Sequence, residues 1–527
     1  MNNCKLNGGN DGKLSIVNCQ LSIEQRQKKQ PKETTRGQDV RNTRGRDACD
    51  TNNRGTVLVV MLVIVSLAAM TAASLLFRMH AELSASLVGN DGQQAYSAAF
   101  SGIRRSMEIL KTPGEDWQDN PALLAGQYVC DDGANKWYFT VFAGSEDGKT
   151  IRNGLECEAG KINLNTADAR TLKAMLSRVP AAADVSADVL VNNLIAYTGR
   201  AASGEAERQP APPYTVKGGP LATREELLLV QGFTGPIVYG NDANLSGILD
   251  PNEDDGEASF PPDKSDGVLD TGLVGMATVL THEQNVDNSK AARININGAP
   301  DDLKKLDSAG LDKATVDFIK LYRAEGNMFV HPSQLLDMEY TPKNPTTAPA
   351  DGGNNNDGTS NTGGGDSAIQ PGKAKDSQPV KSGVTADNLS VVLDRLTTIP
   401  IAARRGQLIG LVNVNTAPPS VLACLPGMDD DTAAEICDAR VGLDEAKKNT
   451  PAWLVSENLL SPEKFKEVAP YLTARGLQYR IRCIGYGVPC GRYVVLEAIV
   501  DLDGTQPRIA YLRDITRLGL PVAIDAK

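Results

Sequence analysis

Residues 56–77 read TVLVVMLVIVSLAAMTAASLLF, and this stretch decides the architecture of the chain. Its 22 residues include no charged side chain. As an α-helix they extend about 33 Å, which is enough to cross the hydrocarbon core of a bilayer. Arg54 precedes the stretch, and Arg78, His80 and Glu82 follow it. The sequence therefore predicts one transmembrane helix in the N-terminal part of the chain.

Charge is distributed unevenly on the two sides of this helix. Residues 1–55 hold 11 lysines and arginines against 6 acidic residues, whereas the remainder holds 43 against 59, and the whole chain carries −11. The positive-inside rule expects a basic segment on the cytoplasmic side, so the acidic body is expected outside the cytoplasm. An acidic body also argues against binding of a nucleic-acid backbone as the main function.

The residues directly before the apolar run do not fit a secretory signal peptide, whose apolar core is shorter and precedes a small-residue cleavage site. The pair Arg54-Gly55 instead resembles the leader of type IV pilins, which is cut after glycine on the cytoplasmic side. This resemblance implies that Gly55 is the cleavage residue and Thr56 the methylated N-terminus of the mature chain. Residues 1–55 are then a basic leader that is removed, or a segment upstream of the true start.

The helix is expected to continue beyond the membrane. Small and apolar residues recur at spacings of three and four, which is typical of a helix face that packs closely: Ala95, Ala98, Ala99, Gly102, Ile103, Met107 and Leu110. The helix is expected over residues 56–111, with a stop near Thr112-Pro113-Gly114. Residues 127–158 carry short β-like runs between turns, so a sheet is expected to lie on the second half of the helix.

A short pattern occurs three times in the body and is its most informative feature. It reads INLN at residues 162–165, ININ at 294–297 and VNVN at 412–415. Apolar residues at helical spacing follow each copy, so each copy predicts a short strand, a cap and a helix. The asparagines can hydrogen-bond the turn, and the candidate cap and first-turn residues are Thr166, Thr416, Pro300 and Pro418.

The sequence around the first copy resembles that of the type II secretion system protein K family, whose members are minor pseudopilins. Residues 158–167, 194–197 and 220–232 carry the resemblance, which extends over about residues 54–517 with two insertions. It implies an α+β fold in which a long transmembrane, pilin-like helix packs on an antiparallel sheet. A large, mainly α-helical domain with helix-hairpin-helix-like repeats is inserted into this core.

The resemblance also implies a mechanical function in the bacterial inner membrane, with a single membrane pass and the C-terminal bulk in the periplasm. The protein would cap the pseudopilus tip and nucleate its assembly for export across the outer membrane by the general secretion pathway. The implied partners are the minor pseudopilins I and J, the major pseudopilin, the prepilin peptidase and membrane lipid. Helix-on-helix packing is expected to involve Leu58, Val59, Val60, Leu62, Val63 and Ile64.

Mature position five, where most pilins carry glutamate, is Val60 here. The protein K family typically lacks this glutamate. At a fibre tip no preceding subunit offers its amino terminus as a partner, and an unpaired carboxylate in lipid is costly. Val60 therefore favours a tip position.

The third copy of the pattern continues into a helix, a Leu425-Pro426-Gly427-Met428 turn and a second helix over residues 429–440. This arrangement resembles the helix-hairpin-helix units of DNA-repair and DNA-uptake proteins, in which hairpin amides hold a phosphate. Three aspartates beside the turn, at 429–431, would repel a phosphate, so no nucleic-acid partner is expected. Two alternatives stay open, namely a membrane-tethered DNA receptor and a type IV pilus tip protein.

One stretch of the insertion matches the twelve-residue calcium loop. Gly247 takes the position of the sharp turn, and Pro251 would interrupt an exiting helix, so a freestanding loop is predicted rather than a full EF-hand. The alternative is an acidic, solvated turn. The predicted oxygen donors, the fourth through its backbone carbonyl, are Asp242, Asn244, Ser246, Ile248, Asp250 and Glu253.

Low-complexity residues 341–387 cannot bury a core and predict a flexible linker. Alternating runs after residue 477 predict strands that complete the sheet. The expected organisation is therefore leader 1–55, membrane and pilin helix 56–111, first part of the core 112–161, inserted domain 162–340 with two repeats and the calcium loop, linker 341–387, third repeat 388–476 and C-terminal strands 477–527.

Six cysteines lie beyond the membrane helix, where disulfides are permitted. The neighbouring pairs 130–157, 424–437 and 483–490 are the simplest connectivity, and the alternative is that some are small buried side chains. The three histidines lie far apart in the sequence, and no phosphate loop or nucleophile elbow is found. The protein is therefore not expected to be an enzyme.

Overall fold

The computed structural model describes residues 53–112, 118–145, 148–200, 216–343, 378–400, 406–504 and 506–521. The predicted leader up to residue 52 and most of the predicted linker lie outside these ranges. The chain divides into two compact parts, Met1–His80 and Ala81–Lys527, and helix α1 (Asn53–Ile109) contributes to both. The helix ends two residues before the predicted boundary at Lys111, ahead of the expected stop.

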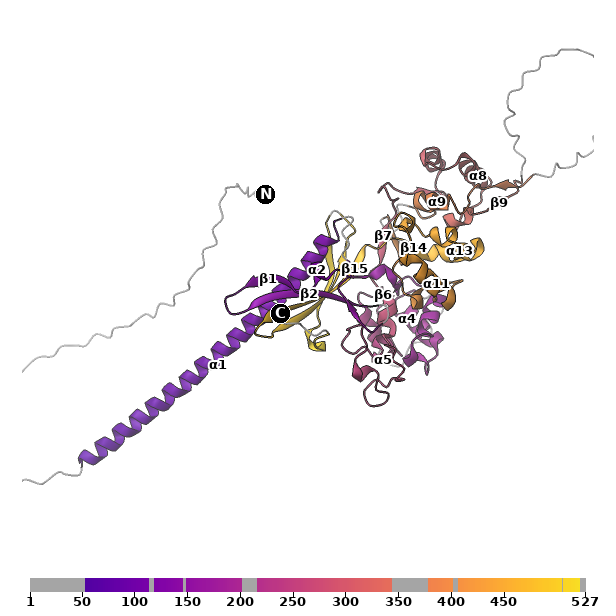
Figure 1. Ribbon diagram of the computed structural model, residues 1–527. Coiled ribbons are helices and arrows are strands. Elements are labelled where there is room, and N and C mark those ends of the chain that lie inside the picture. Colours follow the sequence, from indigo (N-terminus) through magenta and orange to yellow (C-terminus); the bar gives the residue numbers. More distant parts are fainter. Residues whose placement is uncertain are drawn as a thin grey trace, which may run out of the picture. The chain divides into compact units, whose positions relative to one another are not determined.

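A seven-stranded antiparallel sheet forms the pilin-like core of the part Ala81–Lys527 (Figure 1). The strand order is β1-β2-β15-β16-β17, with β3 on β2 and β4 on β15. The first four strands precede the insertion and the last three follow it, as the sequence predicted, which confirms the α+β class. The strands are β1 (Gln127–Asp131), β2 (Lys136–Gly144), β3 (Ile151–Arg152), β4 (Glu156–Cys157), β15 (Gln478–Val488), β16 (Tyr493–Asp501) and β17 (Arg508–Asp514).

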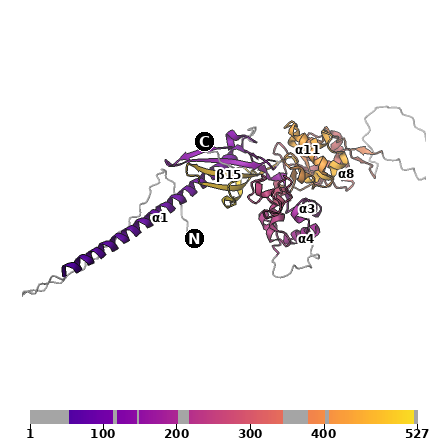
Figure 2. The ribbon, with the colours of Figure 1, turned by 60° about the horizontal axis from the view of Figure 1, so that its bottom comes forward.

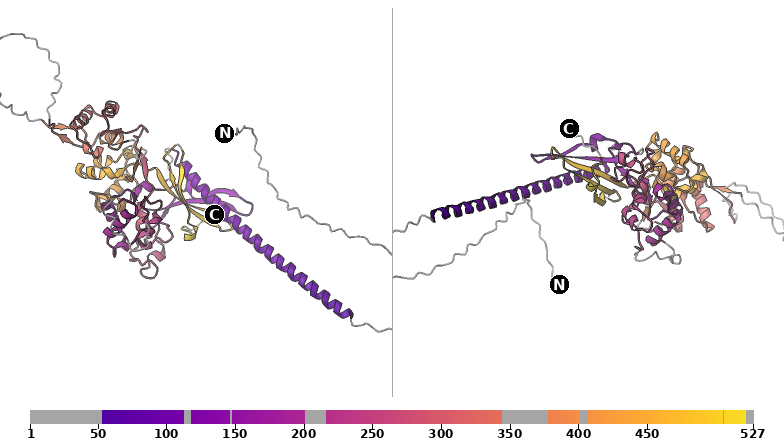
Figure 3. Two further views of the ribbon diagram at one scale, coloured as in Figure 1. Left: turned by 180° about the vertical axis from the view of Figure 1, so that it is seen from behind. Right: turned by 90° about the horizontal axis from the view of Figure 1, so that it is seen from below.

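The C-terminal part of α1 packs on this sheet through the predicted stripe of small residues (Figure 3). Ala95 and Ala99 are fully buried. Gly485 of β15 faces their backbone so closely that a side chain there would collide with it. A side chain at Gly102 of α1 would collide with the side chains of Cys483 and Phe139 on the sheet. Glycine at both positions lets helix and sheet approach each other at backbone distance.

The insertion between β4 and β15 consists of three similar units. In each, a strand carrying the first asparagine of the repeated pattern pairs in parallel with a strand that closes the unit. The apolar faces of all three units form one continuous core. The paired strands are β5 (Ile162–Asn163) with β6 (Ala277–Thr278), β8 (Ile294–Asn295) with β11 (Leu396–Thr397), and β13 (Val412–Asn413) with β14 (Leu472–Thr473).

In the sequence, short helices lie between the two paired strands of each unit (Figure 2). The first unit holds α3 (Ala169–Leu176), α4 (Ala187–Tyr197), α5 (Gly235–Tyr239) and α6 (Gly272–Met276). The second holds α7 (Pro300–Lys304), α8 (Lys313–Ala324) and α9 (Leu389–Arg395). The third holds α10 (Pro419–Leu422), α11 (Asp430–Val441), α12 (Trp453–Ser456) and α13 (Pro462–Val468).

The two asparagines of each repeat have different roles. In all three copies, Oδ1 of the first accepts a hydrogen bond from the backbone N–H of the second, at 2.9–3.0 Å. Nδ2 of the second donates to a backbone carbonyl in the segment that follows the helical hairpin, at Leu221, Phe329 and Lys448 in turn. The pattern therefore fixes the turn and fastens a distant segment to it.

An arginine near the end of the second helix of each unit completes this arrangement. Arg200, Arg323 and Arg440 donate to the carbonyls of Ala167, Asn297 and Ala417, which lie in or next to the repeated pattern. The sequence did not reveal these arginines, because their distance from the asparagines differs among the units.

Replacing Asn415 by alanine is expected to lower the free energy of unfolding by about 2–3 kcal/mol. The indole N–H of Trp453 and the carbonyls of Lys448 and Ala474 would each lose a partly buried hydrogen-bond partner. Urea unfolding of residues 81–527 measures the change, and the exposed Asn252→Ala is the matched control. Equal stability of the two variants would contradict this role.

Two predicted boundaries move. Val380 and Lys381 form β10, which pairs with β9 (Glu339–Tyr340), so the end of the predicted linker 341–387 is ordered and belongs to the second unit. The predicted third repeat, 388–476, begins only after Thr397, because α9 and β11 close the second unit. In the sequence, the linker therefore lies within the second unit and does not separate two units, which composition alone did not show.

Thr166 and Thr416 do not cap helices as predicted. The cap of α3 is Asp168, whose carboxylate accepts a hydrogen bond from the backbone N–H of Thr171, and α10 is preceded by Pro418. The asparagine turns occupy the residues directly after each strand, so the helices begin later. Pro300 is the first residue of α7, as expected for the first turn.

The six described cysteines are not joined in disulfides, so the three predicted neighbouring pairs do not form among the described residues. Cys424, Cys437 and Cys483 are buried. Burial raises the pKa of Cys424 to about 11, which keeps the thiol protonated and unreactive. These three side chains fill the core as small apolar groups.

Candidate functional site

The residues predicted to pack helix on helix lie in the first part of α1. Among the described residues, one helix, Thr56–Ile109, is long and apolar enough to cross a membrane by length and composition. Successive residues turn by about 100°, so the predicted positions fall on about two thirds of the circumference of the helix, and the other apolar residues of the segment occupy the rest. The predicted positions are 47–71% exposed in the single chain: Leu58, Val59, Val60, Leu62, Val63 and Ile64. Lipid or other apolar helices must therefore cover the whole circumference.

The predicted cleavage point lies in the first turns of this helix. α1 begins at Asn53, so Gly55 and Thr56 belong to it. The sequence has no acidic residue between Thr56 and Glu82, and the valine at mature position five is followed by apolar side chains. The segment thus combines a glycine boundary with an apolar surface, and cleavage itself stays a prediction.

The stretch predicted as a calcium loop folds back on itself. The Asp242 carboxylate accepts hydrogen bonds from the backbone N–H groups of Ser246 and Gly247, at 2.8 and 3.0 Å. Gly247 has a φ of +74°, which supplies the predicted sharp turn. The Glu253 carboxylate accepts from the backbone N–H of Asp250 at 3.1 Å. The first and last predicted donors therefore each close one end of the loop.

The middle donors lie within the same loop. Nδ2 of Asn244 donates to Asp250 at 2.8 Å, and the Ser246 hydroxyl bonds the carbonyl of Ile248 at 3.1 Å. The short 3₁₀ helix η4 (Pro251–Glu253) follows, so no long helix leaves the loop, as predicted from Pro251. In this closed form, no set of three acidic, histidine or cysteine side chains among the described residues is poised to hold a metal.

The charges of the loop are poorly compensated. Asp242 and Glu253 are each 3% exposed. Burial raises the pKa of Asp242, although Arg482 opposes the shift, and burial together with Asp242 and Asp250 raises the pKa of Glu253 to about 7. No ion pair to these carboxylates is found among the described residues. The oxygen-rich donor set fits a hard divalent cation, which would compensate this charge.

In the third unit, a tight turn joins α10 to α11, as the sequence predicted, and Gly427 in this turn has a φ of +76°. Its surroundings do not suit a phosphate. The carboxylate of Glu467 lies against Gly427, while Asp429 lies 3.6 Å from the ammonium of Lys464 and Asp430 lies 2.7 Å from the guanidinium of Arg178. The hairpin thus contacts the first unit through Asp430, which pairs with Arg178.

A buried charge cluster, which the sequence analysis did not predict, joins the sheet to the start of the insertion. Arg480 of β15 is 2% exposed and lies 2.7 Å from both Glu158 and Glu497. Arg482, two residues further along the strand, lies 3.3 Å from Glu497. Although burial opposes it, Arg480 lowers the pKa of Glu158 to about 2. The alternation of arginine with apolar residues indicated a strand but not the burial of both its faces.

No family model and no curated protein matches the chain. Among solved structures, a chain in the crystal structure of the GspK-GspI-GspJ complex from the enterotoxigenic Escherichia coli type 2 secretion system is similar over 81% of this chain and 98% of that chain, with 13% identity and a TM-score of 0.29. A likeness this low carries no argument about function, which depends on the residues and their geometry.

Proposed function

We propose that the protein is a minor pseudopilin of a bacterial type II secretion system, of the protein K kind. Helix α1 carries this proposal. Its uncharged, exposed apolar segment continues without a break into a half that packs on an antiparallel sheet. Such a helix can lie in the inner membrane as a single-pass anchor before assembly and against other pseudopilin helices in the fibre, with the acidic body in the periplasm.

The bulky insertion supports a place at the tip of the pseudopilus. Three extra units extend the head beyond the pilin-like core. A head of this size is compatible with the end of a fibre, where no further subunit has to stack. The absence of a carboxylate at Val60 agrees with a first subunit that has no predecessor to bind. In this position the protein would cap the fibre, nucleate assembly with pseudopilins I and J and the major pseudopilin, and perform no enzymatic reaction.

Partner identity tests this proposal against its alternatives. The tagged full chain, extracted from membranes, is expected to co-purify with pseudopilins I and J, and deletion of its gene is expected to stop export of the secreted proteins. Co-purification with type IV pilus proteins would favour the pilus-tip alternative. Tight, salt-sensitive DNA binding would favour the receptor alternative.

We further propose that the loop from Asp242 to Glu253 binds calcium. The buried carboxylates of these two residues and the oxygens of Asn244, Ser246 and Asp250 support it. Calcium loops of extracellular proteins bind with dissociation constants of about 0.1–1 mM. Calcium at about 100 times the dissociation constant is expected to stabilise the protein by about 2.7 kcal/mol. Thermal unfolding with calcium, magnesium or chelator measures this effect.

Variants of the loop separate a calcium site from a solvated turn. Glu253→Gln is expected to abolish the calcium response and to raise the stability without calcium, since it removes a carboxylate from the vicinity of Asp242. Glu257→Gln is the matched control, because Glu257 is exposed in the same region. Unfolding that is insensitive to calcium in the wild type, or equally sensitive in Glu253→Gln, would refute the site.

A further inference from the structure

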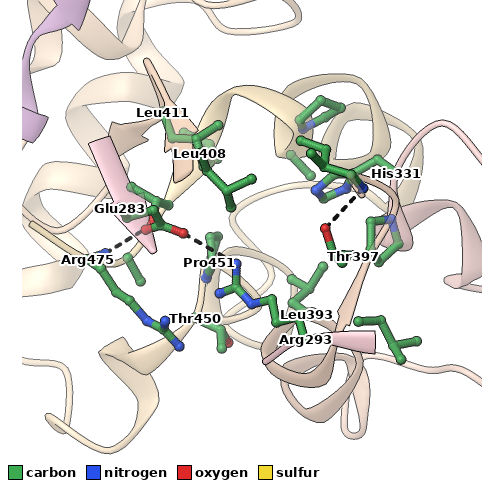
Figure 4. Close-up of a pocket in the computed structure, with 18 of the residues that line it drawn as sticks. Glu283, Arg293, His331, Leu393, Thr397, Leu408, Leu411, Thr450, Pro451 and Arg475 are labelled. Carbon is green, nitrogen blue, oxygen red and sulfur yellow. Dashed lines mark hydrogen bonds and ion pairs between the residues drawn. The ribbon is translucent and has the colours of Figure 1, made fainter. Parts of the chain in front are cut away.

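A pocket of about 260 Å³ lies between the second and third units of the insertion (Figure 4). It is lined by residues 396–399, which close the second unit, and by residues 449–451 and much of 469–475 from the third. Its volume is just below the range of about 300–1,000 Å³ typical of small-molecule sites. Neither pseudopilus assembly nor the calcium loop makes use of this pocket.

The polar wall of the pocket carries hydrogen-bond donors, and only some of them have an acceptor within the described part of the protein. Arg293 extends toward Glu283, and its Nη1 lies 3.3 Å from that carboxylate (Figure 4). The other carboxylate oxygen of Glu283 accepts from the Thr473 hydroxyl. Of the five donors of the Arg293 guanidinium, the hydrogen bonds found among the described residues use two. Both oxygens of the one carboxylate in the wall thus already accept a hydrogen bond, whereas the Arg293 guanidinium has donors to spare.

Thr450 supplies a second donor. It is 5% exposed, lines the pocket, and its hydroxyl has no hydrogen-bond partner within the described part of the chain. A buried hydroxyl without a partner costs about 1–3 kcal/mol. A ligand with an acceptor oxygen would remove this penalty.

His331 supplies a third donor. Its Nδ1 accepts a hydrogen bond from the backbone N–H of Ser333 at 3.2 Å, so the proton of the neutral ring belongs on Nε2. Burial and the nearby charge of Arg293 lower the pKa of His331 to about 4, so the ring is neutral at pH 7. Arg475 also lines the pocket, but its guanidinium donates to Val286, Asn288 and Asp394. The polar wall therefore combines the spare donors of the Arg293 guanidinium with two neutral donors.

The opposite wall is aliphatic. Figure 4 shows Leu408 and Leu411 on one side of the pocket and Leu393 on another, and Leu396 and Ile399 also line it. No aromatic ring is among the lining residues apart from the imidazole of His331. This surface fits a short branched hydrocarbon chain and offers nothing to stack on a planar ligand.

We propose that this pocket binds an aliphatic carboxylate, with the carboxylate at Arg293 and Thr450 and the hydrocarbon chain against Leu408 and Leu411. An anion satisfies the spare donors and the unpartnered hydroxyl together, and hydrogen bonds to charged groups are the stronger kind. The same chemistry is presented by a free short-chain acid and by the carboxyl terminus of a peptide that ends in an aliphatic residue.

Calorimetric titration of the full chain in lipid nanodiscs tests the proposal with matched acids and amides. The probes are 4-methylpentanoate, 4-methylpentanamide, and N-acetyl-glycyl-leucine with a free or an amidated carboxyl terminus. Each acid is expected to bind about tenfold more tightly than its amide. Tighter binding of the peptide would identify a peptide terminus as the ligand, and tighter binding of 4-methylpentanoate a free acid. Equal affinity of acid and amide, or no binding of either acid, would overturn the proposal.

Two variants place the binding in this pocket. Leu408→Trp fills the cavity and is expected to abolish binding, whereas Val441→Trp, at a position 84% exposed, is expected to leave it unchanged. Thr450→Val keeps the shape but removes the hydroxyl, and is expected to weaken acid binding several-fold while the amide is less affected. Unchanged acid binding in a folded Leu408→Trp protein would show that the acid binds elsewhere and would overturn the assignment.

Discussion

Replacing Arg480 by methionine is expected to lower the free energy of unfolding of residues 81–527 by about 3–5 kcal/mol. Arg480 lies 2.7 Å from both Glu158 and Glu497, and both glutamates are completely buried. Without the guanidinium, two carboxylates lie in the interior with weakened compensation. Removing one partner of a buried ion pair is strongly destabilising for this reason, whatever the net value of the pair.

Urea unfolding of the variant and of Arg492→Met measures this effect. Arg492 is an exposed arginine next to β16 of the same sheet. Its replacement is also arginine to methionine, but it leaves no buried carboxylate without a partner. If Arg480→Met lowers the free energy of unfolding by less than about 1 kcal/mol, Arg480 contributes no more to stability than a residue in a surface ion pair. Such a result would also show that the cluster does not hold the sheet and the insertion together.

Acid stability gives a second view of the same cluster. Although burial opposes it, Arg480 lowers the pKa of Glu158 from 4.5 to about 2. A carboxyl whose pKa is lowered in the folded state contributes stability above its unfolded pKa, and this contribution is lost as the pH falls through the folded value. Stability is therefore expected to decline between about pH 4.5 and 2, and Arg480→Met is expected to lose part of this dependence.

Replacing Gly55 by leucine is expected to block maturation and to abolish secretion. Under the proposed function, the prepilin peptidase cuts after Gly55, and the new terminus at Thr56 begins the assembly helix. A retained leader would keep a basic segment attached to the apolar helix, and its charges would have to stay at the cytoplasmic surface. The subunit could then not move out of the membrane into a fibre.

Secretion assays and the electrophoretic mass of the chain measure the outcome of Gly55→Leu. Gly89→Leu is the matched control, since Gly89 lies on the same helix with open space around its α-carbon. The control is expected to be processed and to support secretion. Normal secretion by Gly55→Leu would contradict cleavage at this glycine.

The elements with strong local patterns were predictable from the sequence. The uncharged run, the Ala-Gly stripe and the alternating C-terminal strands each reflect one element, and the structure places α1, β15, β16 and β17 where they were expected. The threefold asparagine pattern was also visible. Its partners were not, because hydrogen bonds such as that from Asn415 to Lys448 join positions far apart in the chain.

Other features depended on tertiary packing and escaped prediction. The boundary between the second and third units follows from the pairing of β11 with β8, across the whole predicted linker. Arg480 and Arg482 looked like the polar face of a strand, yet the charged residues before β5 cover that face. The pocket with Arg293, Thr450 and His331 combines residues from two units, and no sequence motif marks it.

Mass spectrometry of the mature N-terminus, on protein from membranes with and without the prepilin peptidase, tests the pseudopilin assignment most directly. The expected result is a chain that begins at N-methylated Thr56 when the peptidase is present and retains residues before Thr56 when it is absent. A chain that keeps its leader in the presence of the peptidase would contradict the assignment. So would a chain cut after Ala73, one of the small residues near the end of the apolar run, where a signal peptidase could cut.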